Sequence, residues 1–192
     1  SLFFYYWGEG IYILVMLASM LINYFGGIKI QEYKEKNDLK KAKNSLIFAI
    51  GLNLALLISF KYFNFIFDNI GAICGLFFDF KLKISKVHLP IGISFYTFQS
   101  ISYLIDVYRK EVVAQKNLVN YSMYISFFPQ LIAGPIVRYQ DIDQQVENRS
   151  LTIEKFSQGV ERFVLGLGKK VLIANNVGIV ADYLFDLPYD QR

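Results

Sequence analysis

The sequence contains very few residues of the types that carry metal-binding and redox chemistry. Its 192 residues include one cysteine, Cys74, and one histidine, His88. A lone cysteine forms no internal disulfide, and no cluster of histidine and cysteine has the spacing of a zinc site. The sequence therefore predicts neither a metal site nor a bound cofactor, and its cysteine content does not indicate a redox compartment.

Familiar catalytic and nucleotide-binding motifs are also missing. The run Gly166–Lys170 resembles part of a phosphate loop, but Phe163 stands where that loop needs glycine and Lys170 where it needs Ser or Thr. The His-x4-Asp acyltransferase pattern fails because Ile93 is the fifth residue after His88. No Ser-His-Asp or Cys-His pair is assigned, so the sequence yields no catalytic residue. We interpret His88, at a segment boundary, as an interfacial histidine rather than a base.

Proline and glycine are scarce, whereas aromatic residues are abundant. Four prolines and thirteen glycines stand against eighteen phenylalanines and fourteen tyrosines, and 54% of the residues are hydrophobic. Disordered and collagen-like chains lack such apolar groups, and the mean hydropathy of +0.34 exceeds the needs of a soluble core. The composition predicts an all-α integral membrane protein, a polytopic helical bundle whose partner is the lipid bilayer.

The net charge of +4 and the pI of about 9.0 raise the possibility of nucleic-acid binding. The lysines, however, crowd the segment 29–43 between two apolar runs, as in a cytoplasmic loop under the positive-inside rule. We therefore predict no nucleic-acid partner and a location in the cell membrane.

Five hydrophobic segments are candidates for crossing a hydrocarbon core of roughly 30 Å. They cover residues 11–28, 45–67, 89–108, 118–139 and 163–185. Lys61 in the second segment either snorkels to the interface or is an inward-facing charge. Ile70–Phe80 is too short to span, so we expect it to lie in the interface or to re-enter the membrane. The lysines that follow it leave the topology beyond the second segment open.

The third segment carries polar residues on one helical face. Residues Phe95, Gln99, Ser102, Asp106 and Arg109 follow one another at intervals of four, three, four and three. A face that holds Gln99 and Asp106 is costly to expose to lipid, so it must face other helices or a water-filled cavity. Either it joins helices, with Asp106 paired to Arg109, or it lines a substrate path.

The last two segments predict broken and interfacial helices. Pro129 and Gly134-Pro135 interrupt the fourth segment, so Gln130 and this bend are candidates for lining a cavity. Residues 152–161 have the pattern of a short amphipathic helix at a membrane face. The segment 163–185 carries too many polar residues for a lipid-exposed span, so we expect it to be tucked inside or partly interfacial.

Three longer stretches are similar to a known family. They are LPIGISFYTFQ at 89–99 with its continuation to Arg109, FPQLIAGPIVRY at 128–139, and FVLGLGKKVLIAN at 163–175. They resemble the membrane-bound O-acyltransferase family, and more narrowly its alginate and peptidoglycan O-acetyltransferase branch. The resemblance covers essentially all 192 residues.

The resemblance implies an enzyme that moves an acyl group, usually acetyl, from a cytoplasmic thioester to hydroxyls of an extracellular or periplasmic polysaccharide. The expected donor is acetyl-CoA or a protein-bound acyl thioester, and an extracytoplasmic acetyltransferase is an expected partner. The family's histidine base lies downstream of the matched segments. We therefore expect the chain to be one amino-terminal portion of a membrane domain, incomplete at both ends and inactive by itself.

Several residues match signature positions of that family. Those expected to line the substrate path or bind the donor are Gln99, Asp106, Arg109, Gln130, Arg138 and Lys170. Arg138 is expected either to hold an anionic phosphate of the donor or to act as a positive-inside anchor. The alternative function is a non-catalytic membrane subunit for transport or export of glycans, whose polar seam conducts substrate.

Overall fold

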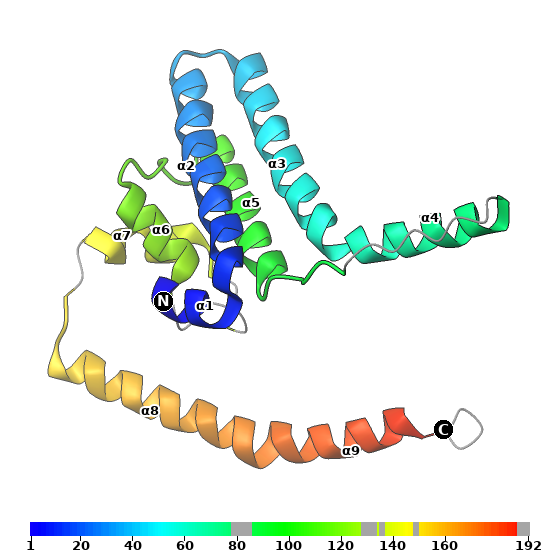
Figure 1. Ribbon diagram of the computed structural model, residues 1–192. Coiled ribbons are helices and arrows are strands. Elements are labelled where there is room, and N and C mark those ends of the chain that lie inside the picture. Colours follow the sequence, from blue (N-terminus) through cyan, green and yellow to red (C-terminus); the bar gives the residue numbers. More distant parts are fainter. Residues whose placement is uncertain (78–85, 128–133, 135–136, 148–149, 188–192) are drawn as a thin grey trace. The chain divides into compact units, whose positions relative to one another are not determined.

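The structure is a computed structural model that describes residues 1–77, 86–127, 134, 137–147 and 150–187, and all its described regular elements are helices (Figure 1). It divides into two units, residues 1–147 and 148–192. The helices of the first unit are α1 (Leu2–Glu9), η1 (Gly10–Tyr12), α2 (Ile13–Glu35), α3 (Leu39–Lys61), α4 (Phe63–Phe77), α5 (Ile93–Arg109), α6 (Leu118–Ser126) and α7 (Tyr139–Glu147). Those of the second are α8 (Ile153–Lys169), the π-helical turn η2 (Lys170–Ala174) and α9 (Asn175–Asp186).

The core of the first unit is formed by α2, α3 and α5, which lie side by side (Figure 1). Two glycines of α2 permit this close packing. A Cβ on Gly27 would lie 2.8 Å from the ring of Tyr103 in α5, and one on Gly26 would lie 3.3 Å from the Cβ of Ala49 in α3. Small residues at these positions therefore let the helix backbones approach, as is common between membrane helices.

A buried pair of amides joins α2 to α3. The Nδ2 of Asn23 donates to Oδ1 of Asn53 at 2.9 Å, and the Nδ2 of Asn53 donates to Oδ1 of Asn23 at 2.7 Å. Each Nδ2 also donates to the carbonyl oxygen four residues earlier, on Ser19 and Ala49. Because lipid offers no hydrogen-bonding partner, this reciprocal pair fixes the register of the two helices.

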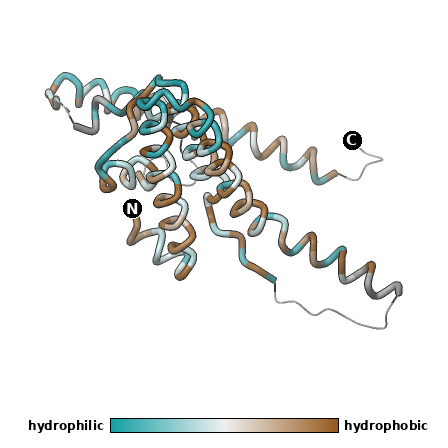
Figure 2. Tube along the Cα trace, turned by 90° about the horizontal axis from the view of Figure 1, so that it is seen from above, coloured by the Kyte–Doolittle hydropathy of each residue, from teal (hydrophilic) through white to brown (hydrophobic). Residues whose placement is uncertain are grey.

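The turn between α2 and α3 is polar, and hydrophilic residues gather at this end of the two helices (Figure 2). Asn37 has a φ of 61°, a left-handed conformation that asparagine tolerates. Asp38 then caps α3 by accepting a hydrogen bond from the backbone N–H of Lys41. Hydrogen bonding to the Lys41 side chain lowers the pKa of Asp38, and hydrogen bonding to Glu32 raises the pKa of Lys36.

At the opposite end of the unit, α1 and η1 are tied to the chain that enters α5. The hydroxyl of Tyr5 donates to the carbonyl of Ile91 at 2.9 Å. His88 Nε2 lies 3.0 Å from Oε2 of the buried Glu9, and its ring lies 5.2 Å from that of Tyr12. These contacts give His88 a structural role at the entrance to α5.

The predicted segment 45–67 does not correspond to one helix. The α3 helix begins earlier, at Leu39, and ends at Lys61, and α4 starts after the bend at Tyr62. The Asp38 cap moves the start of α3 toward the hairpin, so its 23 residues still reach roughly 35 Å. Lys61, at its last turn, lies with its Nζ 5.8 Å from the centre of the Tyr62 ring. Lys61 is exposed, and its snorkelling to the interface stays a prediction.

The later segments also differ in their boundaries. The stretch 118–139 contains α6, which ends at Ser126, and α7 begins only at Tyr139. In the second unit, the expected amphipathic helix 152–161 and the segment 163–185 merge into one continuous helical run, 153–186. No proline separates them, and the glycines of α8 are tolerated within the helix.

Three described helical runs are long and apolar enough to cross a membrane: 2–35, 39–61 and 153–186. Together with the composition, they confirm the prediction of an all-α, multi-pass membrane protein.

Candidate functional site

The polar face of α5 is packed inside the first unit. Gln99 and Asp106 are only 8% and 5% exposed, whereas Arg109 at the end of the helix is exposed. The Nε2 of Gln99 donates to the carbonyl of Tyr124 in α6 at 3.1 Å. Gln99 and Asp106 thus face the interior of the unit, where Gln99 contacts another helix, and a role of this face in a substrate path stays a prediction.

Four fully buried tyrosines surround the middle of this face: Tyr103, Tyr121, Tyr124 and Tyr139. The Tyr103 ring centroid lies 4.9 Å from that of Tyr121 and 5.1 Å from that of Tyr139, with the latter pair edge to face. The cluster therefore joins α5, α6 and the start of α7 through aromatic packing.

Hydrogen bonds from Gln115 complete the tyrosine cluster. Its backbone N–H donates to the hydroxyl of Tyr103 and its Nε2 donates to the hydroxyl of Tyr139, both at 3.0 Å. The hydroxyl of Tyr124 donates to the carbonyl of Val137, which immediately precedes Arg138 in the chain. The cluster thereby fixes the backbone from which the Arg138 side chain extends.

Asp106 lies at one end of the seam, within electrostatic range of charged residues of both signs. Its Oδ2 is buried without a hydrogen-bond partner among the described residues. Arg138 and Arg109 both lie within electrostatic range of this carboxylate, as do the acidic Glu111 and Asp141. No salt bridge joins Asp106 to Arg109, although both are described: the Nη1 of Arg109 lies 3.9 Å from Oε1 of Glu111. The Asp106–Arg109 pair, one of the two alternatives above, is therefore wrong, and Oδ2 accepts no hydrogen bond from the described residues.

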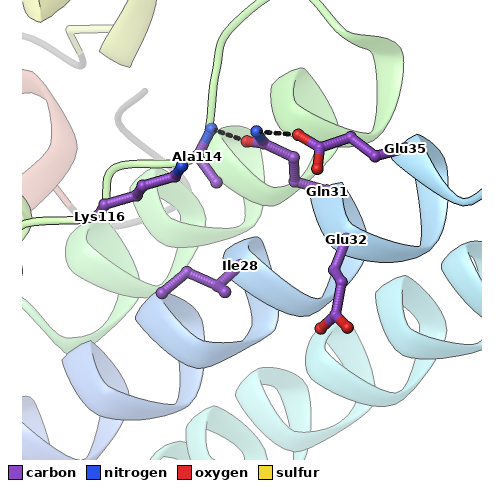
Figure 3. Close-up of a pocket in the computed structure, with 6 residues that line it drawn as sticks. All are labelled: Ile28, Gln31, Glu32, Glu35, Ala114 and Lys116. Atoms are coloured by element: carbon purple, nitrogen blue, oxygen red, sulfur yellow. Dashed lines mark hydrogen bonds between the residues drawn. The ribbon is translucent and has the colours of Figure 1, made fainter.

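The same end of the unit contains an open cavity of about 250 Å³ between α2 and the chain after α5 (Figure 3). Its lining residues are Ile28, Gln31, Glu32, Glu35, Ala114 and Lys116. Gln31 Oε1 accepts from the backbone N–H of Ala114 at 2.5 Å, and its Nε2 donates to Glu35 at 2.6 Å. Gln31 thus links α2 to the loop that carries Gln115, and this loop in turn supports the tyrosine cluster.

The remaining predicted site residues lie elsewhere. Gln130 falls outside the described residues. Lys170 belongs to the second unit, where it is exposed and opens the π-helical turn η2. Turns of this kind are rare, and those that occur are often at functional sites. A role for Lys170 in the site stays a prediction. The structure thus places Arg109 and Arg138 near Asp106, whereas Gln99 lies about two helical turns away on the same face of α5.

Sequence reasoning missed Gln115 and the tyrosine cluster. The spacing of Tyr103 four residues after Gln99, and of Tyr124 three after Tyr121, places each pair on one helical face. That signal was available, but aromatic residues are so frequent in this chain that the spacing did not distinguish these tyrosines from lipid-facing ones. In the described part of the chain, no group of three or more His, Cys, Asp or Glu residues is arranged to hold a metal ion.

Comparison with known proteins gives matches over nearly the whole chain. The model of the membrane-bound O-acyltransferase family matches residues 2–192. A probable alginate O-acetylase, AlgI, of Pseudomonas putida is 41% identical over 187 residues, and that of Pseudomonas aeruginosa is 38% identical. A peptidoglycan O-acetyltransferase of Helicobacter pylori is 33% identical over 215 residues.

Each of these three alignments covers 97% of the present chain but only 36 to 39% of the relative. The chain therefore spans well under half the length of these relatives. No solved structure matches it.

Proposed function

The chain belongs to the membrane-bound O-acyltransferase family, and from this we propose that it forms part of an enzyme that acetylates a polysaccharide. The acetyl group comes from a thioester donor on the cytoplasmic side and is transferred to hydroxyls of an extracytoplasmic glycan. The observation that carries this proposal is the family match over residues 2–192, together with relatives named alginate O-acetylase and peptidoglycan O-acetyltransferase.

The reaction requires a base and a way to hold the donor. The base takes the proton of the acceptor hydroxyl, the oxygen attacks the thioester carbonyl, and the carbon–sulfur bond breaks to release the thiol. We do not assign His88 as this base, because it precedes α5 and lies at the end of that helix remote from Asp106 and the proposed donor site. The base is contributed by the rest of the complete protein, so the 192-residue chain alone is inactive.

The donor is bound at the end of the α5 seam, where Arg138 and Arg109 lie near Asp106. The donor is acetyl-CoA or an acyl thioester on a carrier protein, and either carries phosphate groups that suit the fork of a guanidinium. Both arginines are exposed, so a ligand reaches them without rearrangement of the core. Arg138 binds the donor phosphate in this proposal, and Gln99 and Asp106 line the path toward the opposite face.

The positive charge at this end of the unit supports its cytoplasmic placement. Lysines lie on both sides of the turn between α2 and α3. Arg109 ends α5, and Lys110 and Lys116 follow it at the same end of the unit. The hydrogen bond between Gln31 and Ala114 joins the hairpin end that carries the lysines to the loop after α5. Under the positive-inside rule this end faces the cytoplasm, where a thioester donor is available.

Deletion of the gene in its host tests the activity. We expect the surface polysaccharide to keep its amount and chain length but to lose its O-acetyl groups, which NMR of the purified glycan measures. Complementation with the complete gene restores the acetyl signal. A deletion strain that retains full O-acetylation, or one that stops exporting the glycan, contradicts the proposal and favours a transport subunit.

An extracytoplasmic acetyltransferase is the partner expected for this enzyme. Purification of the tagged complete protein in mild detergent, followed by mass spectrometry, should recover such a protein in near-stoichiometric amount. Recovery of the complete protein alone under these conditions argues against a stable partner.

A further inference from the structure

A second cavity, separate from the α5 seam, lies between α2 and α3. Its volume is about 270 Å³, and its lining residues are Ile22, Phe25, Gly26, Lys29, Ser45, Phe48, Ala49 and Leu52. On each helix these residues recur at intervals of three, four and seven, so each set forms one continuous stripe. Seven residues of helix extend roughly 10 Å, so the cavity is a groove that runs along the two helices.

The groove has an apolar floor and aromatic walls. Gly26 and Ala49 form the floor, where the two helices approach closely: a Cβ added to Gly26 would lie 3.3 Å from that of Ala49. Phe25 and Phe48 stand on either side, 57% and 68% exposed. Both rings lie on helical runs that are long and apolar enough to span a membrane, so the groove opens toward the hydrocarbon region.

The groove is polar at one end only. Lys29 is the last α2 residue in its lining and Ser45 the first α3 residue, and the antiparallel hairpin places both at the end near the turn. Glu32, one turn beyond Lys29, is already paired with Lys36 at 2.5 Å. Among the described residues, Lys29 forms no salt bridge, so its charge is available to a ligand.

We propose that this groove binds an anionic glycerophospholipid, with one acyl chain along the floor and the phosphate at Lys29 and Ser45. The groove has one positive charge at the end of an apolar lining, which complements an anionic headgroup joined to an acyl chain. The lysine-rich face is the one at which anionic headgroups attract basic residues near the membrane surface. The proposal does not depend on the activity proposed above.

Native mass spectrometry of the complete protein in detergent tests this site. The probes are phosphatidylglycerol and phosphatidylcholine with identical acyl chains, added at equal concentration. We expect phosphatidylglycerol to be retained preferentially and Lys29→Glu to weaken this binding about five-fold or more. Lys29→Arg should retain the binding. Lys43→Glu is the matched control, because Lys43 lies on the same end of α3 but outside the groove lining.

Ser45→Trp provides a second variant that blocks the polar end of the groove without removing a charge. It should lower retention of phosphatidylglycerol as Lys29→Glu does. Equal retention of the two lipids, equal loss in the Lys43→Glu control, or unchanged retention in both groove variants would overturn the proposal. So would a complete protein that retains no phospholipid.

Discussion

At the scale of single residues, Arg138 is the side chain whose proposed role is easiest to isolate. It is exposed and near Asp106, and its backbone neighbour Val137 is held by the Tyr124 hydroxyl. Truncation of its side chain therefore removes a charge without opening the buried core.

We predict that Arg138→Ala in the complete protein raises the apparent KM for the thioester donor about ten-fold to a hundred-fold, with little change in stability. This range corresponds to the loss of a hydrogen bond to a charged group. Initial-rate kinetics at varied donor concentration measure it. The KM of Arg138→Lys should fall between those of wild type and Arg138→Ala. Arg162→Ala, which removes an exposed arginine of α8, should have the wild-type KM. An unchanged KM in Arg138→Ala rejects donor binding by this residue.

The amide pair of Asn23 and Asn53 gives a second prediction at this scale. A double-mutant cycle with Asn23→Ala and Asn53→Ala should show a favourable coupling of about 0.6 to 1.7 kcal/mol, the range found for hydrogen bonds between membrane helices. Unfolding of the reconstituted protein by a denaturing detergent provides the free energies. If the loss of unfolding free energy in the double variant equals the sum of the losses in the single variants, the two amides do not stabilise each other.

Single residues were only partly predictable from the sequence. The spacing of Gln99 and Asp106 placed both inside the bundle, because a polar seam on a hydrophobic helix has few other solutions. The ion pair expected between Asp106 and Arg109 was wrong, since Asp106 is buried while Arg109 extends beyond the packed core and meets Glu111 instead. Position along a helix does not reveal where the bundle ends.

At the scale of elements, Gly27 controls the distance between α2 and α5. Its Cα faces the ring of Tyr103, and a methyl group there would lie 2.8 to 2.9 Å from two ring-system atoms. We predict that Gly27→Ala destabilises the protein by about 1–3 kcal/mol, the usual cost of overpacking a core. The unfolding midpoint of Gly27→Ala, in temperature or in detergent concentration, should be lower than that of wild type.

Gly51→Ala is the control for this variant. Gly51 also lies inside a membrane-length helix, but a Cβ there meets no atom within 4 Å. It should be neutral or slightly stabilising, because alanine has the higher helix propensity. Equal destabilisation by the two substitutions would show that the α2–α5 contact does not set the effect.

The helices themselves were easier to predict than their ends. Apolar runs located α2, α3 and α5, because only helices satisfy their own backbone within lipid. The break at Tyr62 was missed because no proline marks it, and the joining of 152–161 to 163–185 in one helical run was missed because the composition changes between them. Hydropathy reports where lipid can cover a segment, and it says little about where a helix bends.

At the scale of the whole molecule, we propose that a helical membrane fold carries out acetyl transfer across the bilayer. The proposed chemistry rests on the family match, and the proposed route is the seam of α5, where Gln99 and Asp106 are buried and which ends near Arg109 and Arg138. Composition and periodicity alone gave the membrane fold but no reaction, because they identify no catalytic group among these residues.

The most direct test is acetyl transfer by the purified complete protein, together with its extracytoplasmic partner if one is recovered, in sealed vesicles. A thioester donor with a labelled acetyl group is supplied at the lysine-rich face, and a hydroxyl-bearing oligosaccharide at the other. We expect labelled acetyl esters on the oligosaccharide, with one free thiol released for each ester formed. An intact thioester, with the oligosaccharide unmodified or carried across the bilayer, would contradict this expectation.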